Sequence, residues 1–180
     1  MTLHDSALAT LRGWEPPSHA QAALREAYVG LLLARPDACL RSCVPGHLTA
    51  STLVVNRSHS HLLLTHHGMI GRWLQFGGHP EPADTSLLEV AGREAREESG
   101  VEELLLDADP IHLDVHAVTC RNSPPTRHFD VRFVAVAPDD AVPVVSSESH
   151  DVRWWPIADF PDPLGDMADL VSAALHRLKG

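Results

Sequence analysis

The sequence predicts an α/β fold, and three observations support this prediction. Apolar residues recur at helical spacing near the N-terminus, alternate as in strands over several later segments, and return to helical spacing in two further segments. A length of 180 residues suits one domain. A hydrophobic content of 44% is enough to bury a core in a domain of this size.

The N-terminal residues form an expected helical extension. Residues 18–34 have the apolar spacing of an amphipathic helix, which Ser18 can cap and an Arg-Pro pair ends. A shorter helical turn is expected over residues 7–11. Because a Val-Pro-Gly sequence then interrupts the pattern, we expect an extension over residues 1–45 and the main domain over residues 46–180.

Strand patterns dominate the main domain. Two segments rich in β-branched residues and leucine are separated by a polar turn of four residues, which predicts a hairpin. The other elements follow from the same periodicities and from the Gly and Pro residues near their ends. The expected strands are residues 48–56, 62–65, 71–76, 111–118, 128–137 and 152–155, and the expected helices are residues 85–99 and 166–178.

Charge and composition exclude several classes of partner. A formal net charge of -10 argues against duplex nucleic acid, because phosphate backbones are bound by basic surfaces. No apolar run is long enough for a membrane span, and no signal peptide is evident, so the expected location is cytoplasmic. The three cysteines, Cys39, Cys43 and Cys120, lack the spacing of a disulfide framework and are expected to be small buried or half-buried thiols.

The central helix, residues 85–99, follows a loop rich in Gly and Pro. Ser86 and Glu89 have the spacing of a capping box at its start, and Gly100 stands where a left-handed residue ends a helix. We expect one face of this helix to pack on the sheet through Leu88, Ala91 and Ala95.

Three glutamates share another face of this helix. Glu94, Glu97 and Glu98 occupy positions i, i+3 and i+4, which are surface neighbours. Such like charges repel by a few tenths of a kcal/mol per pair. Arg93 and Arg96 point in other directions around the helix axis and cannot neutralise all three. A bound Mg²⁺ or Mn²⁺ would do so, because hard cations prefer oxygen ligands.

The glycine loop and the glutamate helix together resemble the signature of the Nudix hydrolase family. That signature is a glycine, five residues, a glutamate, seven residues, and then R-E-U-x-E-E-x-G-U, where U is apolar. Residues 93–101 match the second half throughout. Gly78 and Asp84 match the first half, although Asp84 replaces a glutamate and the gap after it is one residue longer. The resemblance implies an α/β/α sandwich with a mixed central sheet.

The resemblance also implies a divalent-metal site, for Mg²⁺ or Mn²⁺. Glu97 and Glu98 match the principal metal ligands, and Glu94 matches a further ligand or the catalytic base. Arg93 matches an arginine that orients the first glutamate, and the carbonyl of Gly78 is expected to reach a metal ion.

Family members often recruit another acid from a loop a few residues ahead of a tryptophan in a late strand. Glu148, six residues before Trp154, is the candidate in this chain. The implied reaction is hydrolysis of a phosphoanhydride bond, in a nucleoside diphosphate linked to another group or in a nucleoside triphosphate. The expected catalytic residues are Arg93, Glu94, Glu98 and Glu148.

The expected partner is a small, phosphorylated, nucleotide-like substrate. Trp73 can stack on a base or fill the core. The histidines include no pair with the spacing of a local zinc motif. In some Nudix subfamilies a proline downstream of the signature marks ADP-ribose as the substrate, and a tyrosine marks dinucleoside polyphosphates. Neither marker is present at the expected place, because residue 117 is alanine and Tyr28 is the only tyrosine. The candidate substrate-binding residues are Trp73, Gln75, His79, His128, Asp130 and Arg132.

Two alternative functions use the same fold. Isopentenyl-diphosphate isomerases carry Cys-Gly-His-Pro in the corresponding loop, whereas this chain has Gly77 in place of that catalytic cysteine. A nucleotide-binding module without catalysis would leave the complete glutamate trio unexplained. The helical extension could form a homodimer contact or cover the pocket, and its composition does not decide between these roles.

Overall fold

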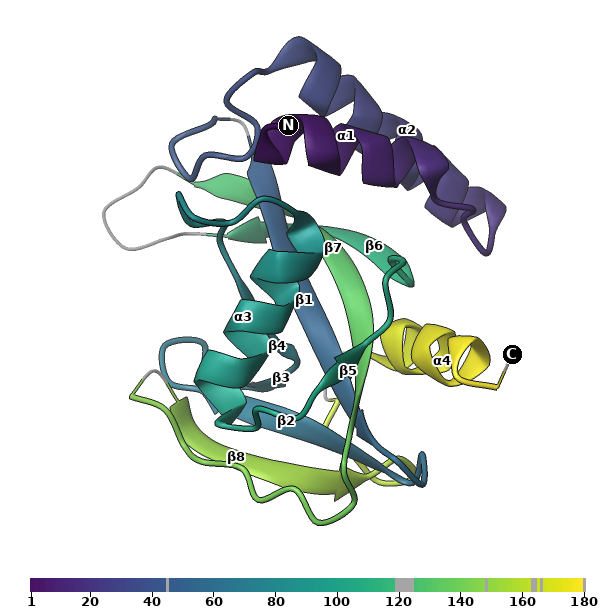
Figure 1. Ribbon diagram of the computed structural model, residues 1–180, viewed down its shortest axis with the longest axis vertical. Helices are drawn as coiled ribbons and strands as arrows, with labels where there is room; N and C mark the ends of the chain where they lie inside the picture. Colours follow the sequence, from purple (N-terminus) through teal and green to yellow (C-terminus); the bar gives the residue numbers. More distant parts are fainter. Residues whose placement is uncertain (45, 119–124, 148, 163–164, 166, 180) are drawn as a thin grey trace.

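Figure 1 presents a computed structural model that describes residues 1–44, 46–118, 125–147, 149–162, 165 and 167–179. Within these residues the strands are β1 (His47–Asn56), β2 (His61–His67), β3 (Trp73–Leu74), β4 (Phe76–Gly78), β5 (Leu105–Leu106), β6 (His112–Val118), β7 (Thr126–Ala137) and β8 (Ser149–Pro156). The helices are α1 (Leu3–Gly13), α2 (His19–Ala34), α3 (Leu87–Ser99) and α4 (Ala168–Arg177).

The strands form one mixed sheet, as expected from the sequence. Its main path runs β3-β2-β1-β7-β5, while β4 pairs with β1, β6 with β7 and β8 with β2. The central strands β1 and β7 are parallel, from His47 opposite His128 to Asn56 opposite Ala137. The other pairs are antiparallel.

Helices cover both faces of this sheet, which confirms the expected α/β/α sandwich (Figure 1). Successive side chains of a strand point to opposite faces. Leu48 and Ala50 of β1 accordingly pack with residues of α1, α2 and α3, whereas Leu53 and Val55 pack with residues of α4. Because both faces are covered there, every residue of β1 is buried.

The first helix is longer than the turn expected over residues 7–11. Thr2 caps it: the Thr2 hydroxyl accepts the Asp5 backbone N–H at 3.1 Å, and the Asp5 carboxylate accepts the Thr2 N–H at 3.0 Å. This reciprocal pair satisfies two of the N–H groups at the helix start that would otherwise lack partners. The second helix begins where expected, with Ser18 as its cap.

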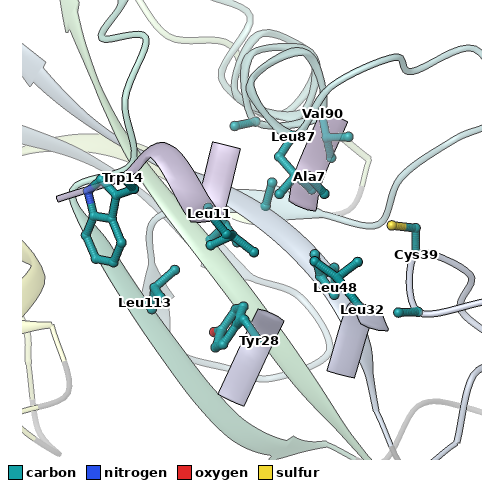
Figure 2. Close-up of a cluster of buried hydrophobic side chains, with 14 of the residues drawn as sticks. Ala7, Leu11, Trp14, Tyr28, Leu32, Cys39, Leu48, Leu87, Val90 and Leu113 are labelled. Carbon is teal, nitrogen blue, oxygen red and sulfur yellow. The ribbon is translucent and has the colours of Figure 1, made fainter. Parts of the chain in front are cut away.

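Both N-terminal helices contribute to the main core rather than standing apart from it. Figure 2 shows Leu11, Tyr28 and Leu32 beside Leu48 of β1 and Leu113 of β6. The Tyr28 hydroxyl approaches the backbone carbonyl oxygens of Asp114 at 2.6 Å and Asp130 at 3.0 Å. The extension is therefore anchored to two strands by both apolar and polar contacts.

This anchoring predicts a contrast between two adjacent leucines of α2. Leu32 is 1% exposed and Leu33 is 62% exposed. We expect Leu32→Ala to lower the free energy of unfolding by about 2–5 kcal/mol, because it leaves a cavity in the shared core. Leu33→Ala should change it by no more than about 0.5 kcal/mol. Denaturant unfolding followed by circular dichroism measures both. An unchanged main transition in Leu32→Ala would show that the extension unfolds separately.

The short elements differ most from the sequence-based expectation. The single strand expected over residues 71–76 is divided into β3 and β4, and β5 was not expected. Helix α3 begins at Leu87, with the Ser86 hydroxyl accepting the Glu89 N–H. The Glu89 carboxylate completes no capping box, because it accepts from the N–H and hydroxyl of Thr85 instead.

The C-terminal end of α3 and the cysteines agree with expectation. Gly100 has φ 68°, the left-handed conformation that ends a helix at low cost. Cys39 and Cys43 are buried free thiols, and Cys120 lies outside the described residues. No helix among the described residues has both the length and the apolar composition needed to cross a bilayer.

Candidate active site

Two glycines bring strand β4 close to both β1 and helix α3. A Cβ atom at Gly77 would lie 2.4 Å from the Cβ of Ser51 and 2.7 Å from the carbonyl oxygen of Ala50. A Cβ atom at Gly78 would lie 2.5 Å from the Oε1 atom of Glu94. The contact with the backbone of β1 therefore permits only glycine at position 77, whereas a side chain at position 78 would require the Glu94 carboxylate to shift.

Arg93 links the loop after β4 to the acidic face of α3. Its Nη1 atom lies 3.1 Å from both Glu94 Oε1 and Glu97 Oε2. Its Nη2 atom donates to the backbone carbonyl of His79 and to Asp84, each at 3.0 Å. Burial opposes the charged form of Arg93, but its hydrogen bonds and the nearby carboxylates outweigh burial and raise its pKa. Arg93 thus remains a fixed cation among acids.

The three helix glutamates occupy different environments. Glu98 is 8% exposed, and its Oε1 atom accepts the backbone N–H of Gly77 at 3.1 Å. The side chain of Glu94 is 16% exposed, whereas that of Glu97 is 59% exposed. Of the three, only Glu97 therefore stands largely in solvent.

The contacts of the two arginines of α3 differ from those that simple helix geometry predicts. Arg93 contacts Glu94 and Glu97 together, although adjacent positions point in different directions around a helix, because its long side chain bends along the surface. Arg96 turns away from the acids, and its Nη1 atom donates to the Gly92 carbonyl at 3.0 Å. Of these two arginines, only Arg93 therefore supplies a partial counter-charge to the acidic face.

Asp84, the loose match to the signature, also lies in this group. Its side chain is 7% exposed, and its two oxygens accept from Arg93 Nε at 3.3 Å and Nη2 at 3.0 Å. Asp84 Oδ2 also accepts the Glu81 backbone N–H at 2.7 Å. The longer gap after Asp84 therefore does not remove it from the site, and Asp84 closes the glycine loop onto the helix.

A polar surface lies on the face of the sheet that α4 covers further along. The strand register places Asp130 of β7 opposite Thr49 of β1, and Arg132 opposite Ser51. The Asp130 carboxylate accepts from the hydroxyls of Thr49 at 3.0 Å and Ser51 at 2.7 Å, and from Arg132 Nε at 3.0 Å. Buried polar groups are normally paired in this way.

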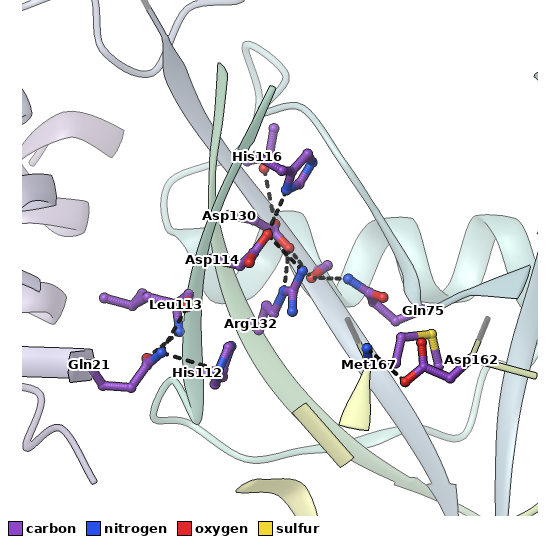
Figure 3. Close-up of polar contacts among 12 residues, drawn as sticks. Gln21, Gln75, His112, Leu113, Asp114, His116, Asp130, Arg132, Asp162 and Met167 are labelled. Carbon is purple, nitrogen blue, oxygen red and sulfur yellow. Dashed lines mark hydrogen bonds and ion pairs between the residues drawn. The ribbon is translucent and has the colours of Figure 1, made fainter. Parts of the chain in front are cut away.

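Two further side chains extend this polar surface (Figure 3). Arg132 Nη2 lies 3.0 Å from Asp114 Oδ2 of β6, while Gln75 Nε2 lies 3.5 Å from the Ser51 hydroxyl. Arg132 is 6% exposed, and its Nη1 atom is buried with no hydrogen-bond partner among the described residues. A buried donor of this kind is suited to an acceptor atom of a ligand or to a water molecule.

Three histidines gather beside this surface. His47 of β1, His79 after β4 and His128 of β7 place one ring nitrogen each within 4.8 Å of one another. Burial lowers the pKa of His79 to about 4 and that of His128 to about 3, and the positive charges of Arg41 and of neighbouring histidines act in the same direction. All three rings are therefore neutral near pH 7, since burial also lowers the pKa of His47.

A family model decides the identity of this loop, helix and sheet. The NUDIX domain model matches residues 45–175. The chain belongs to the Nudix hydrolase family. This membership confirms the expected family and its enzyme class, the Nudix pyrophosphohydrolases.

Solved Nudix structures have the same fold. A Caenorhabditis elegans Ap4A hydrolase binary complex has 19% identity and a TM-score of 0.56, over 74% of this chain and 98% of the other. A Nudix-family hydrolase from Clostridium perfringens has 21% identity and a TM-score of 0.55, over 73% and 97%.

The Nudix domain of Shewanella oneidensis NrtR, complexed with ADP ribose, has 20% identity and a TM-score of 0.54, over 73% and 87%. No curated protein matches the chain. At these identities the likeness of the solved structures establishes the fold alone.

Glu148 and Trp73 were also expected in the Nudix site. Glu148, the candidate acid of the late loop, lies outside the described residues. Trp73 packs edge-on against Trp155, at 5.1 Å between ring centroids, and Arg153 lies over its ring. These contacts favour a core role for Trp73 over stacking on a base.

Sequence reasoning missed several members of the site. Thr49 and Ser51 lie in an apolar strand, and Asp114 lies on an edge strand, so none stands out by spacing. His47 is 1% exposed at the start of β1. Only the register of β1, β6 and β7 brings these residues together, and single-sequence periodicity does not give a register.

Proposed function

We propose that this Nudix protein is a Mg²⁺- or Mn²⁺-dependent hydrolase. It cleaves a phosphoanhydride bond in a nucleoside diphosphate linked to another group, or in a nucleoside triphosphate. The observation that supports the proposal most strongly is the glycine loop packed on Glu94 and Glu98, with Arg93 between the acids and the loop.

The donors at this site suit a hard divalent cation. Glu94, Glu97, Glu98 and the Gly78 carbonyl offer oxygen atoms only, the ligand type that Mg²⁺ and Mn²⁺ prefer. The close approach of Gly78 to the Glu94 carboxylate supports the assignment of both residues to one metal site. When bound, a divalent ion supplies charge neutralisation to phosphate oxygens and lowers the pKa of a coordinated water.

The residues around this ion have separate roles in the proposed reaction. Arg93 orients Glu94 and Glu97 through charge-assisted hydrogen bonds, and the Gly77 N–H orients Glu98. Oriented acids need little reorganisation when the substrate binds. A carboxylate accepts the proton of the attacking water, and the candidates are Glu94 and Glu148.

We further propose that the polar surface binds the nucleoside part of the substrate. Arg132 Nη1 is a buried donor without a partner among the described residues, and it can donate to a base or sugar oxygen. Asp130 holds the Arg132 guanidinium in place, while Gln75 offers an amide at the edge of the same surface. His79 and His128 border this region.

A nucleotide panel tests the proposed function. The protein is incubated with Mg²⁺ or Mn²⁺ and with nucleoside triphosphates, dinucleoside polyphosphates, ADP-ribose and isopentenyl diphosphate, in ¹⁸O-labelled water. We expect release of a monophosphate product that depends on the added ion and stops on chelation. The position of ¹⁸O in the products identifies which phosphorus is attacked.

The alternative function, nucleotide binding without catalysis, makes the opposite prediction. It requires that no product forms from any member of the panel and that nucleotide binding survives chelation. Isothermal titration with each nucleotide, in Mg²⁺ and then in chelator, distinguishes the two. Isomerisation of isopentenyl diphosphate without release of phosphate would favour the isomerase instead.

A further inference from the structure

The three-histidine cluster has the composition of a transition-metal site. The Nε2 atoms of His47 and His79 are 3.0 Å apart. The ring of His128 lies 5.1 Å from that of His47 and 4.8 Å from that of His79, measured between centroids. In a tetrahedral zinc site with bonds of about 2.0–2.1 Å, ligand nitrogens lie roughly 3.3 Å apart. The observed spacing, up to 4.8 Å, requires only small ring movements to reach this value.

The hydrogen bonding of His47 favours a metal ligand. Its Nδ1 atom lies 3.3 Å from the backbone carbonyl oxygen of Cys43. Because a carbonyl only accepts, this contact places the proton on Nδ1 and leaves a lone pair on Nε2, facing His79. Histidines that bind metals usually donate their other ring N–H to such a carbonyl or carboxylate.

The positions of the three histidines make this site distinct from the carboxylate site. His47 and His128 face one another across the central parallel strands, and His79 reaches them from the end of β4. The backbone carbonyl of His79 accepts from Arg93, so His79 connects the two sites through its main chain while its ring belongs to the cluster.

The chemistry of the donors differs between the two sites as well. Imidazole nitrogen suits zinc, copper, nickel and cobalt, whereas Mg²⁺ prefers oxygen. The positive charge of Arg41 lowers the pKa of His47 and His79 and also opposes a metal cation beside them. The Arg41 side chain is exposed, however, and solvent screens such a charge. The negative charge of Asp130 raises the pKa of His128 and favours a cation there.

We propose that His47, His79 and His128 bind one Zn²⁺ ion, or a similar transition-metal ion, through three imidazole nitrogens. The fourth position is left for water or for an oxygen atom of a ligand, as in zinc sites with three protein ligands. This site goes beyond the proposed hydrolase function, and His79 and His128 then act through the ion.

Cobalt substitution tests the proposal without a need for activity. The protein, stripped with a chelator, is titrated with Co²⁺ in excess Mg²⁺, so that Mg²⁺ occupies the oxygen site. We expect a single equivalent of Co²⁺ to produce strong visible absorption of low-coordinate cobalt, and Zn²⁺ to displace it. The absence of a visible band in excess Mg²⁺ would overturn the proposal.

Variants identify the ligands. His79→Gln and His128→Gln are each expected to weaken Co²⁺ binding by about 100-fold or more, since loss of an outer-shell partner alone costs roughly 10- to 100-fold. His61→Gln on β2 is the matched control and should bind Co²⁺ as the unmodified chain does. Unchanged binding in both cluster variants would exclude these ligands.

Two further measurements separate this proposal from the hydrolase proposal and from folding defects. The Glu97→Gln, Glu98→Gln double variant should lose hydrolysis but keep the cobalt spectrum. In the unmodified, ¹⁵N-labelled chain, Zn²⁺ should shift the imidazole nitrogen resonances of three histidines. If the double variant loses the cobalt spectrum while the histidine resonances stay unchanged, the ion belongs to the carboxylates and the proposal is wrong.

Discussion

Glu98→Gln is expected to lower kcat by roughly two to three orders of magnitude while leaving the fold almost unchanged. Glutamine keeps one side-chain oxygen for the Gly77 N–H, which Glu98 now accepts at 3.1 Å. It removes the negative charge that the proposed Mg²⁺ requires. Loss of one preorganised electrostatic contact to a transition state commonly costs about 10²–10³ in kcat.

Steady-state kinetics on the best substrate of the panel measure this effect. Glu97→Gln tests the exposed acid of the trio in the same assay, and we expect a loss of similar order. Glu103→Gln is the control, because Glu103 is an exposed glutamate just after the helix. Near-normal turnover in both Glu97→Gln and Glu98→Gln would remove the proposed metal site, provided that circular dichroism shows folded variants.

The sequence predicted those parts of the fold that depend on local chemistry. Helix α3 has a hydroxyl at its start, a glycine at its end and a repeating apolar face, and each of these acts within a few residues. The apolar face was placed approximately. Leu87 and Val90 are buried with Ala91 and Ala95, whereas Leu88 is only partly buried.

The sequence did not predict features that depend on pairing between distant strands. Strand β5 has two residues, too few for a periodic pattern, and exists because Leu105 and Leu106 pair with β7. The His47 and His128 rings approach because β1 and β7 are parallel in one particular register. A shift of one residue would send one ring to the opposite face.

The sequence predicts an acidic site from helical spacing, but it does not predict the contacts that the glutamates make. Helical spacing places Glu94, Glu97 and Glu98 near each other, but among the described residues the only group of three metal-binding side chains with converging ligand atoms is the histidine cluster. The Glu98 carboxylate instead accepts the backbone N–H of Gly77, and Arg93 lies between Glu94 and Glu97. The path of the Arg93 side chain depends on the loop fold around Asp84 and His79, which helix geometry alone does not include.

Arg93→Met is expected to reduce both activity and stability. The side chains of Asp84 and Glu94 are only 7% and 16% exposed, and without Arg93 they lose a shared counter-charge. Breaking a fully buried ion pair costs about 3–5 kcal/mol, and we expect about 2–3 kcal/mol here because Arg93 is 21% exposed. The loop carbonyl of His79 also loses its donor, so kcat should fall by at least roughly 10²-fold as the glutamates lose their orientation.

Arg96→Met is the matched control, since it removes an arginine three residues further along the same helix. Arg96 donates to the backbone carbonyls of Gly92, Glu102 and Leu104 rather than to the acids, so this variant should lose about 1–3 kcal/mol of stability and retain kcat. Thermal unfolding with and without Mg²⁺ adds a readout that a purely structural role would not change. In Arg93→Met the acids repel one another more strongly, so added Mg²⁺ should raise its Tm more than that of Arg96→Met. Equal Mg²⁺ shifts in the two variants, with kcat retained in Arg93→Met, would show that Arg93 neither neutralises nor orients the metal-binding acids.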